Sequence, residues 1–180
     1  MANHALLTAM GRDRPGIVAA VSGVLYECGC NIEDSTMARL GGDFAIMLMV
    51  SLPGGLSCEV LSDRLDRVRV EMNLTLQLTA VSEEEAAARG TEAASYVIHV
   101  YGADRKGIVA KVTGHLAARQ INIANLTTHI IAHQNPLYVM MIDVVLPRGV
   151  DSGQLAEELA GIGRDIGVQI TVRPKDDARF

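Results

Sequence analysis

The sequence is poor in aromatic residues, which make up 3% of the chain and include two phenylalanines and no tryptophan. Sheet-type RNA-binding modules stack bases on aromatic side chains, and nucleic-acid surfaces are basic. This chain instead has a formal net charge of −5, and its lysines and arginines form no block. These absences argue against direct contact with nucleic acid.

Long apolar runs are also absent. The longest covers residues 44–50, whereas a membrane-spanning helix needs about 18 or more apolar residues. The amino terminus has no basic stretch that leads into an apolar one, as a signal peptide would. We therefore expect no membrane contact and a cytoplasmic location.

Sulfur and imidazole ligands for a metal are few. Cys28, Cys30 and Cys58 form no C-x-x-C pair, and in a reducing compartment we interpret them as small buried apolar residues. His129 and His133 have a spacing that a zinc site can use, but exposed loop histidines are the simpler interpretation. We predict neither a metal site nor a cofactor.

What the chain does contain is an internal repeat. Residues 13–36 align without a gap to residues 104–127, and twelve of these 24 pairs are identical. With three residues added in the second copy, the alignment continues to the end of each unit. Two units of this size indicate a tandem domain pair rather than a solenoid. The predicted divisions are a first domain at 1–81, a linker at 82–95, a second domain at 96–174 and a tail at 175–180.

The first half of each copy has the pattern of a strand followed by a helix. Short apolar runs predict first strands, and apolar residues at steps of three and four predict the helices that follow. Pro15 suits the first helical position, with Asp13 or Arg14 as the cap. Gly29 ends the first helix in a left-handed conformation, whereas Gln120 stands there in the second copy, so that end is expected to close differently.

The second half of each copy predicts a hairpin, a helix and a last strand. The hairpins are expected to turn at 40–43 and near 133–136. Their second strands are almost continuously apolar, which predicts central strands covered on both faces, with Met47, Met49, Met140 and Met141 in the core.

Each copy is therefore β-α-β-β-α-β, an α+β unit of the ferredoxin-like type. It is expected to form a four-stranded antiparallel sheet with two helices on one face. Strand two should lie at an edge, where another copy can pair with it. We predict that the two sheets join into one eight-stranded sheet.

The shared residues cluster at two places, the turn after the first strand and the start of the second strand. We expect these places to be neighbours. The turn offers backbone N–H groups that attract a carboxylate, and Asp13 adds a negative charge that attracts an ammonium group. Together they suit a zwitterion such as an amino acid, and Asp13→Ala is then expected to abolish binding at little cost in stability.

A purely structural interpretation stays open beside this one. In it Asp13 only caps the helix, Gly16 only permits packing, and Asn31 only ties the edge strand to the turn.

The segment from Asp13 to Ala19, the helix after it and the run from Gly29 to Asp34 resemble the ACT-domain family, and the resemblance extends over about 160 residues. It implies a non-catalytic regulatory module that binds an amino acid at a domain interface, acts through a protein partner and forms a possible homodimer. The residues that match the family's ligand-binding positions in the first copy are Gly11, Asp13, Arg14, Pro15, Gly16, Ile17, Asn31 and Ile32. Those in the second copy are Gly102, Asp104, Arg105, Lys106, Gly107, Ile108, Asn122 and Ile123.

Some positions depart from the family pattern. Serine-binding members carry His and Asn where this chain has Gly11 and Asp13, so the effector is expected to differ or to be absent. Lys106 replaces a proline, and we expect the second site to be the weaker. Acylphosphatases share the topology and are the enzyme alternative, but their glycine-rich phosphate loop does not match, and we predict no catalytic residues.

Overall fold

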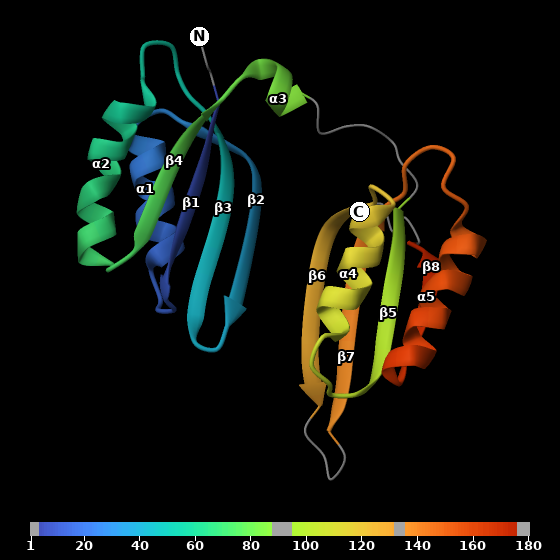
Figure 1. The fold of residues 1–180 in the computed structure, drawn as a ribbon. Coiled ribbons are helices and arrows are strands. Elements are labelled where there is room, and N and C mark those ends of the chain that lie inside the picture. Colours follow the sequence, from blue (N-terminus) through green and yellow to red (C-terminus); the bar gives the residue numbers. More distant parts are fainter. Residues whose placement is uncertain (1–3, 88–94, 132–135, 176–180) are drawn as a thin grey trace. The chain divides into compact units, whose positions relative to one another are not determined.

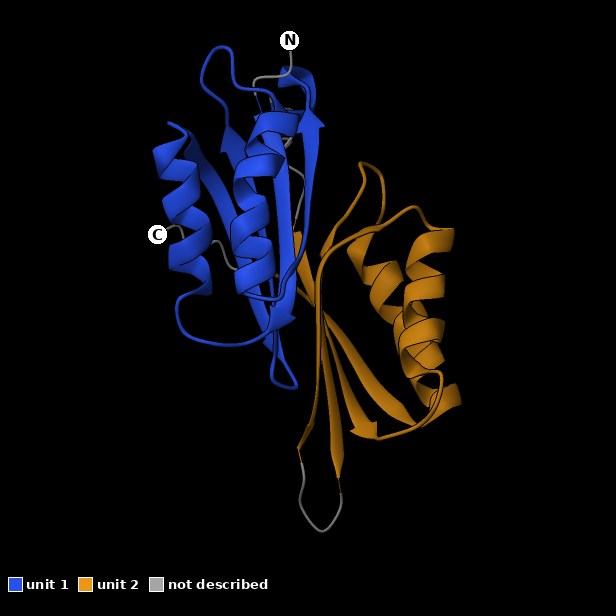
Figure 2. Ribbon diagram, turned by 90° about the vertical axis from the view of Figure 1, so that its left-hand side faces the viewer, with its two compact units in different colours: residues 1–91 blue, residues 92–180 orange. Residues whose placement is uncertain are grey.

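The computed structural model describes residues 4–87, 95–131 and 136–175. The chain divides into two compact units, residues 1–91 and 92–180, called unit 1 and unit 2 below (Figures 1 and 2). Each unit repeats the same order of strands and helices, as the internal repeat predicts.

Unit 1 contains four strands and two main helices. They are β1 (His4–Arg12), α1 (Ile17–Glu27), β2 (Asn31–Leu40), β3 (Asp43–Ser51), α2 (Cys58–Glu71) and β4 (Thr75–Val81). A short helix, α3 (Glu83–Ala87), follows β4. It lies in the stretch at 82–95 that the sequence predicts to be a linker.

Unit 2 repeats the pattern of unit 1. Its elements are β5 (Ser95–Ala103), α4 (Ile108–Ala118), β6 (Asn122–Ile131), β7 (Leu137–Val145), α5 (Ser152–Ile166) and β8 (Val168–Pro174). Most of the predicted second hairpin turn lies outside the described residues. Within the described part of the chain, no helix is long and apolar enough to cross a membrane.

Both sheets are antiparallel and four-stranded, in the orders β2-β3-β1-β4 and β6-β7-β5-β8. This confirms the predicted fold class and places strand two of each copy at a sheet edge. Figure 1 shows both helices of each unit on the same face of its sheet, here called the helix face. The opposite face is called the open face. The joining of the two sheets into one stays a prediction.

Each core lies between the sheet and its two helices. In unit 1, alternate residues of β1 and β3 are buried against three side chains of α1, namely Ile17, Val21 and Leu25. In unit 2 the equivalent residues of α4, Ile108, Val112 and Leu116, are buried in the same way. The spacing of three and four residues therefore predicted the buried stripe of each first helix correctly.

The central strands are not covered on both faces, contrary to the prediction. Met140 is buried on the helix face. Met47 and Met141 lie on the open faces and are 49% and 40% exposed, whereas Met49, which lies on the open face beside Met47, is buried. The helices cover only one face of each sheet, so a continuous apolar run does not require burial on both sides.

The start of α1 also differs from the prediction. The helix begins at Ile17, and Gly16 precedes it in a left-handed conformation with φ of 96°. No side chain caps this end, so neither Asp13 nor Arg14 is the cap, and Pro15 lies before the helix. Gly107 takes the same conformation before α4, with φ of 91°.

The end of α4 closes in the same way as the end of α1, which corrects the expectation for Gln120. Gln120 adopts a left-handed conformation with φ of 56°, and Gly29 has φ of 71°. Two backbone hydrogen bonds match after the helices. Cys30 N–H donates to Leu25 O as Ile121 N–H donates to Leu116 O, and Gly29 N–H donates to Tyr26 O as Gln120 N–H donates to Ala117 O, each at about 3 Å. The left-handed backbone conformation after the helix is thus the same in both copies, although the residue that adopts it differs.

The three cysteines, predicted to be small buried apolar residues, are only partly buried. Cys28, Cys30 and Cys58 pack against the edge of the unit 1 core. Burial raises the pKa of the Cys30 thiol, and the neighbouring Cys28 adds to the rise. Both effects disfavour the reactive thiolate form.

Candidate functional site

The predicted turn of unit 1 lines a pocket of about 580 Å³. The turn and the start of α1 supply residues 13–19, and the hairpin of β2 and β3 supplies Met37, Arg39 and Phe44. The structure thus brings together Asp13, Arg14, Pro15, Gly16 and Ile17. Met37, Arg39 and Phe44 were missed because their counterparts in the repeat, Thr128, Ile130 and Tyr138, are different residues.

Asn31 and Ile32 do not belong to this pocket, and the expectation that they neighbour the turn is wrong. Asn31 pairs with Ser51, which pairs with His4 at the start of β1, whereas the turn follows Arg12 at its end. The two places are therefore separated by the length of β1, roughly 25 Å. Helix α1 runs back along β1, so it delivers the chain to the opposite end of the sheet.

The same separation holds in unit 2. Asn122 pairs with Val145, which pairs with Ser95 at the start of β5, and the turn with Asp104 follows the end of that strand. A single small ligand cannot touch both predicted places within one unit.

Backbone donors face the pocket of unit 1 at the start of α1. The first helical hydrogen bond is donated by Ala20 N–H to Gly16 O at 2.8 Å. The N–H groups of Ile17, Val18 and Ala19 therefore have no partner within the helix. An anion placed there also gains from the helix dipole, by about 0.3 to 1 kcal/mol at an exposed site.

Asp13 ties the turn to the hairpin. Its carboxylate lies 2.6 Å from Arg39 Nε, and its backbone N–H donates to Gly42 O at 3.0 Å. The Asp13 side chain is 27% exposed, and that of Arg39 is 66% exposed. The negative charge expected to attract an ammonium group thus already has a cationic partner.

Arg14 and Gly11 have structural partners. Arg14 Nη2 donates to Glu71 O at 2.5 Å, at the last residue of α2, where a cation complements the helix dipole. A side chain at Gly11 would place its Cβ 3.0 Å from Asn73 O, so glycine lets β1 pass close to the chain that leaves α2.

The turn of unit 2 shares the backbone geometry but not the ion pair. Ile130 stands where unit 1 has Arg39, and Asp104 forms no ion pair or hydrogen bond within the described ranges. Burial raises the pKa of Tyr138, and the nearby Asp104 carboxylate adds to the rise. The Arg105 guanidinium lies against Gly167 at the end of α5, where a Cβ would come within 2.9 Å of it.

The remaining predicted residues of unit 2 follow their counterparts. Gly102 lies close to β8, since a Cβ there would come within 3.0 Å of the Val168 backbone. Lys106 is exposed, Ile108 is buried, and Asn122 and Ile123 begin β6 at the far end of the sheet.

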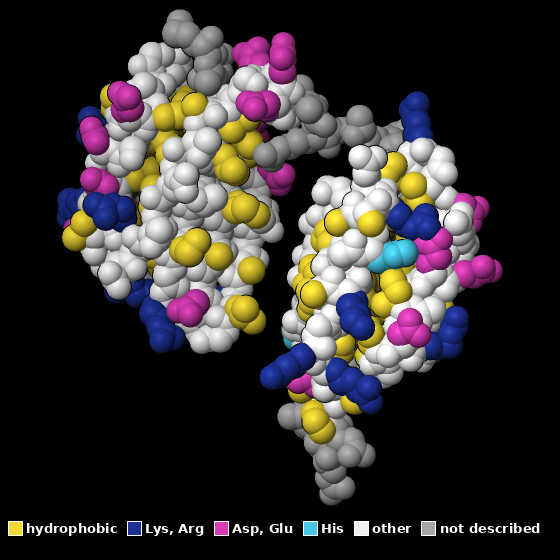
Figure 3. Space-filling model, in the orientation of Figure 1, with side chains coloured by type: hydrophobic (Ala, Val, Ile, Leu, Met, Phe, Trp, Pro, Cys, Tyr) yellow, Lys and Arg dark blue, Asp and Glu magenta, His cyan; other side chains and the backbone are white. Residues whose placement is uncertain are grey.

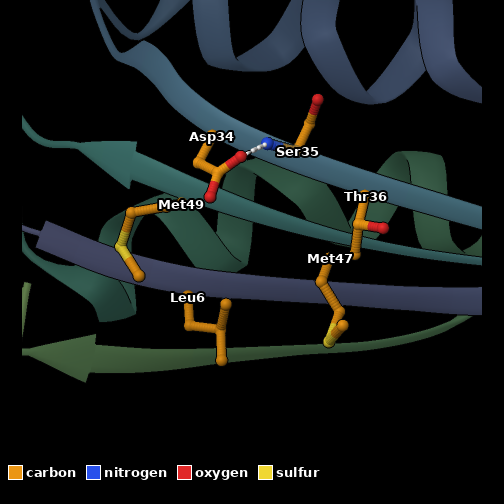
Figure 4. Close-up of a pocket in the computed structure, with 6 residues that line it drawn as sticks. All are labelled: Leu6, Asp34, Ser35, Thr36, Met47 and Met49. Carbon is orange, nitrogen blue, oxygen red and sulfur yellow. Dashed lines mark hydrogen bonds between the residues drawn. The ribbon is translucent and has the colours of Figure 1, made fainter. Parts of the chain in front are cut away.

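A second hollow, of about 150 Å³, lies on the open face of unit 1 (Figure 4). It is lined by Leu6, Asp34, Ser35, Thr36, Met47 and Met49, and Figure 4 shows the Asp34 carboxylate accepting a hydrogen bond from Ser35 N–H at 2.8 Å. Its one charged lining residue is an acid, so this hollow does not suit a carboxylate. Figure 3 shows further hydrophobic side chains at the surface of each unit.

Ligands for a metal do not converge in the described part of the chain. No group of three or more His, Cys, Asp or Glu side chains is placed to hold an ion there. His133 lies outside the described residues, so the suggested pairing with His129 has no structural description.

Two ferredoxin-like units in tandem, each with a left-handed glycine before its first helix, define a class of repeated two-domain α+β proteins. The ACT domain model matches residues 3–81 and 95–173, and the chain belongs to that family. This confirms the resemblance seen in the sequence.

Several known proteins are similar over most of the chain. The glycine cleavage system transcriptional repressor of Escherichia coli (strain K12) is 26% identical over 170 residues, which is 93% of this chain and 87% of that protein. A crystal structure of an unknown protein from Galdieria sulphuraria aligns with a TM-score of 0.83 and 27% identity, over 96% of this chain and 98% of that one. A structure provisionally assigned as a glycine cleavage system transcriptional repressor aligns with a TM-score of 0.67 and 26% identity, over 94% and 95% of the two chains.

Proposed function

We propose that this protein is a non-catalytic sensor of a small carboxylate-bearing metabolite, an amino acid in the first instance. The observation that carries the proposal is the pocket over the first turn of unit 1, where unpartnered helix N–H groups lie beside an exposed guanidinium. Such donors suit a carboxylate. Membership of the ACT domain family supports the same role.

The response is proposed to pass through another protein. The chain has a net charge of −5 and no basic block for binding DNA. Similarity to a transcriptional repressor supports an effect on transcription, exerted in the cytoplasm through a regulatory partner. The edge strands β2 and β6 are the proposed surfaces for a homodimer. Because the turn and Asn31 lie at opposite ends of one unit, a small ligand could touch both kinds of residue only where two units meet.

The structural alternative has specific support of its own. Gly11, Arg14 and Asp13 each have a packing, capping or ion-pair partner within unit 1, so the repeated turn has a structural role even without a ligand. The acylphosphatase alternative needs an arginine of the turn close to a strand asparagine, whereas Arg14 and Asn31 lie at opposite ends of the sheet.

A thermal-shift screen against the twenty amino acids tests the sensor proposal. A ligand at about one hundred times its Kd stabilises the folded state by about 2.7 kcal/mol, which raises Tm by several degrees in a domain of this size. Val18→Glu places a carboxylate in the pocket at an exposed position of the first helical turn, where an acid does not harm the helix. It is expected to remove the shift.

Val109→Glu makes the same change at the equivalent, exposed position of unit 2 and shows which unit binds. A flat screen with folded protein would favour the purely structural module. An unchanged shift in both variants would place the ligand elsewhere.

A further inference from the structure

The residues that line the pocket of unit 1 differ from their counterparts in unit 2 at several positions, and Arg39 is one of them. Arg39 pairs with Phe44 across the hairpin of unit 1, and Ile130 pairs with Tyr138 at the same register position of unit 2. The backbone is otherwise alike, since Gly16 and Gly107 have nearly equal φ values. The hairpin of unit 1 thus supplies a cationic side chain at this position, whereas the hairpin of unit 2 supplies an apolar one.

Arg39 is placed to contact a ligand. It lines the pocket of unit 1, its side chain is 66% exposed, and its ion pair with Asp13 runs through Nε. A guanidinium carries five N–H donors in a planar fork, and a carboxylate can accept two of them at once. The pairing through Nε leaves the outer nitrogens for such a contact.

Asp13 holds this guanidinium in position. Its backbone is fixed by the hydrogen bond to Gly42 O, and its carboxylate is 2.6 Å from Arg39 Nε. The charged groups at the pocket are then Asp13, Arg39 and Arg14, one acid and two bases. This balance favours an anion and leaves no uncompensated carboxylate for an ammonium group.

We propose that Arg39 is the specificity-determining residue of unit 1, contacting the carboxylate of the ligand, and that Asp13 is its positioning residue rather than an ammonium-binding group. This inference rests on the proposed function. It narrows the ligand class of unit 1 to small carboxylates whose ammonium group is not recognised. Unit 2, with Ile130 at this position, lacks the contact.

The test follows backbone amide resonances of the ¹⁵N-labelled full chain during titration with sodium acetate, glycine or methylammonium chloride, at constant ionic strength set with sodium chloride. Acetate and glycine are expected to shift the amides of residues 17–19 with Kd values within about threefold of each other. Methylammonium is expected to leave these amides unchanged.

Variants separate the roles of the side chains. Arg39→Ile is expected to weaken acetate binding about 10- to 100-fold, as for the loss of a charged hydrogen bond. Arg39→Lys is expected to restore part of it, and Asp13→Asn to weaken it less than Arg39→Ile does. Arg12→Ile removes an equal charge from the same end of the sheet, but on the open face, and serves as the matched control with unchanged binding.

The outcomes distinguish this inference from the function on which it rests. Glycine binding without acetate binding, or equal binding by Arg39→Ile, would overturn the role of Arg39 and leave the amino-acid sensor intact. Acetate binding at unit 1 in a protein that no amino acid affects would keep the role of Arg39 and reject the amino-acid sensor. No shift with either carboxylate would reject the role of Arg39, and a flat thermal-shift screen against the twenty amino acids as well would reject the sensor.

Discussion

At the scale of single residues, the repeated turn combines structural and ligand-facing positions. Gly11 is required by the close passage of the chain after α2, and Arg14 by the carbonyl at the end of that helix. The backbone donors of residues 17–19 at the start of α1 have no partner within the helix. Identity between the two copies at Gly11 and Arg14 therefore has a structural explanation, and does not by itself mark a binding residue.

Gly163 shows how one missing side chain sets the distance between a helix and a strand. A Cβ at Gly163 would lie 2.6 Å from Val168 O, whereas a Cβ at Gly161 would have only ordinary contact, at 3.7 Å, with the end of the Arg164 side chain. Both glycines lie inside α5. They form a matched pair for substitution.

We predict opposite effects of the two alanine substitutions. Gly163→Ala is expected to destabilise unit 2 by about 1 to 3 kcal/mol, because α5 must move away from β8. Gly161→Ala is expected to stabilise it by about 0.5 to 1 kcal/mol, because alanine favours the helix. Urea unfolding of each variant measures both, and a gain in stability for Gly163→Ala would contradict the close approach.

At the scale of elements, helix ends show the limit of residue preference. Gln120 occupies the left-handed position that Gly29 occupies in the other copy, and the same backbone hydrogen bonds follow. An L-residue pays about 1 to 2 kcal/mol to adopt this conformation. Gln120 keeps this conformation in spite of that cost, and the residue after it, Ile121, is buried in the core of unit 2.

Exchanging the two residues is expected to reverse the local strain. Gln120→Gly should stabilise unit 2 by about 1 kcal/mol, less than the full strain because glycine loses more entropy on folding. Gly29→Gln should destabilise unit 1 by a similar amount, since the nearest atom to its Cβ, Pro53 Cγ, is 3.7 Å away and causes no clash. Chemical denaturation of both variants checks the signs, and a loss of stability in Gln120→Gly would refute the strain.

At the scale of the whole molecule, the two units have separate cores. One core contains residues of unit 1 only and the other residues of unit 2 only. Leu61 and Leu155 are equivalent positions in α2 and α5, and both are fully buried. Damage to one core is therefore expected to remain within its own unit.

Leu61→Ala and Leu155→Ala test this separation. Each is expected to cost its unit about 2 to 5 kcal/mol through lost burial and a residual cavity. Hydrogen exchange resolved by peptide should show faster exchange in β1 and β3 for Leu61→Ala, and in β5 and β7 for Leu155→Ala. Faster exchange throughout the chain in either variant would show that the units unfold as one.

The sequence by itself determined the duplication, the order of strands and helices, the edge position of strand two and the buried stripe of each first helix. These features are readable because apolar periodicity and repeated residues are properties of a linear chain. Residues 13–17 were assigned to a ligand site from the repeat and from the family resemblance, and they line the candidate pocket.

Only the tertiary structure decided which distant residues meet. The sequence placed Asn31 beside Asp13, whereas the antiparallel pairing of β1, β3 and β2 puts it at the far end of the sheet. It contained no signal for Arg39, which lies 26 positions after Asp13 and is not repeated in unit 2. Arg39 contacts Asp13 because α1 reverses the direction of the chain and β2 then runs back to the turn. No local sequence pattern predicts which residue of β2 reaches the turn.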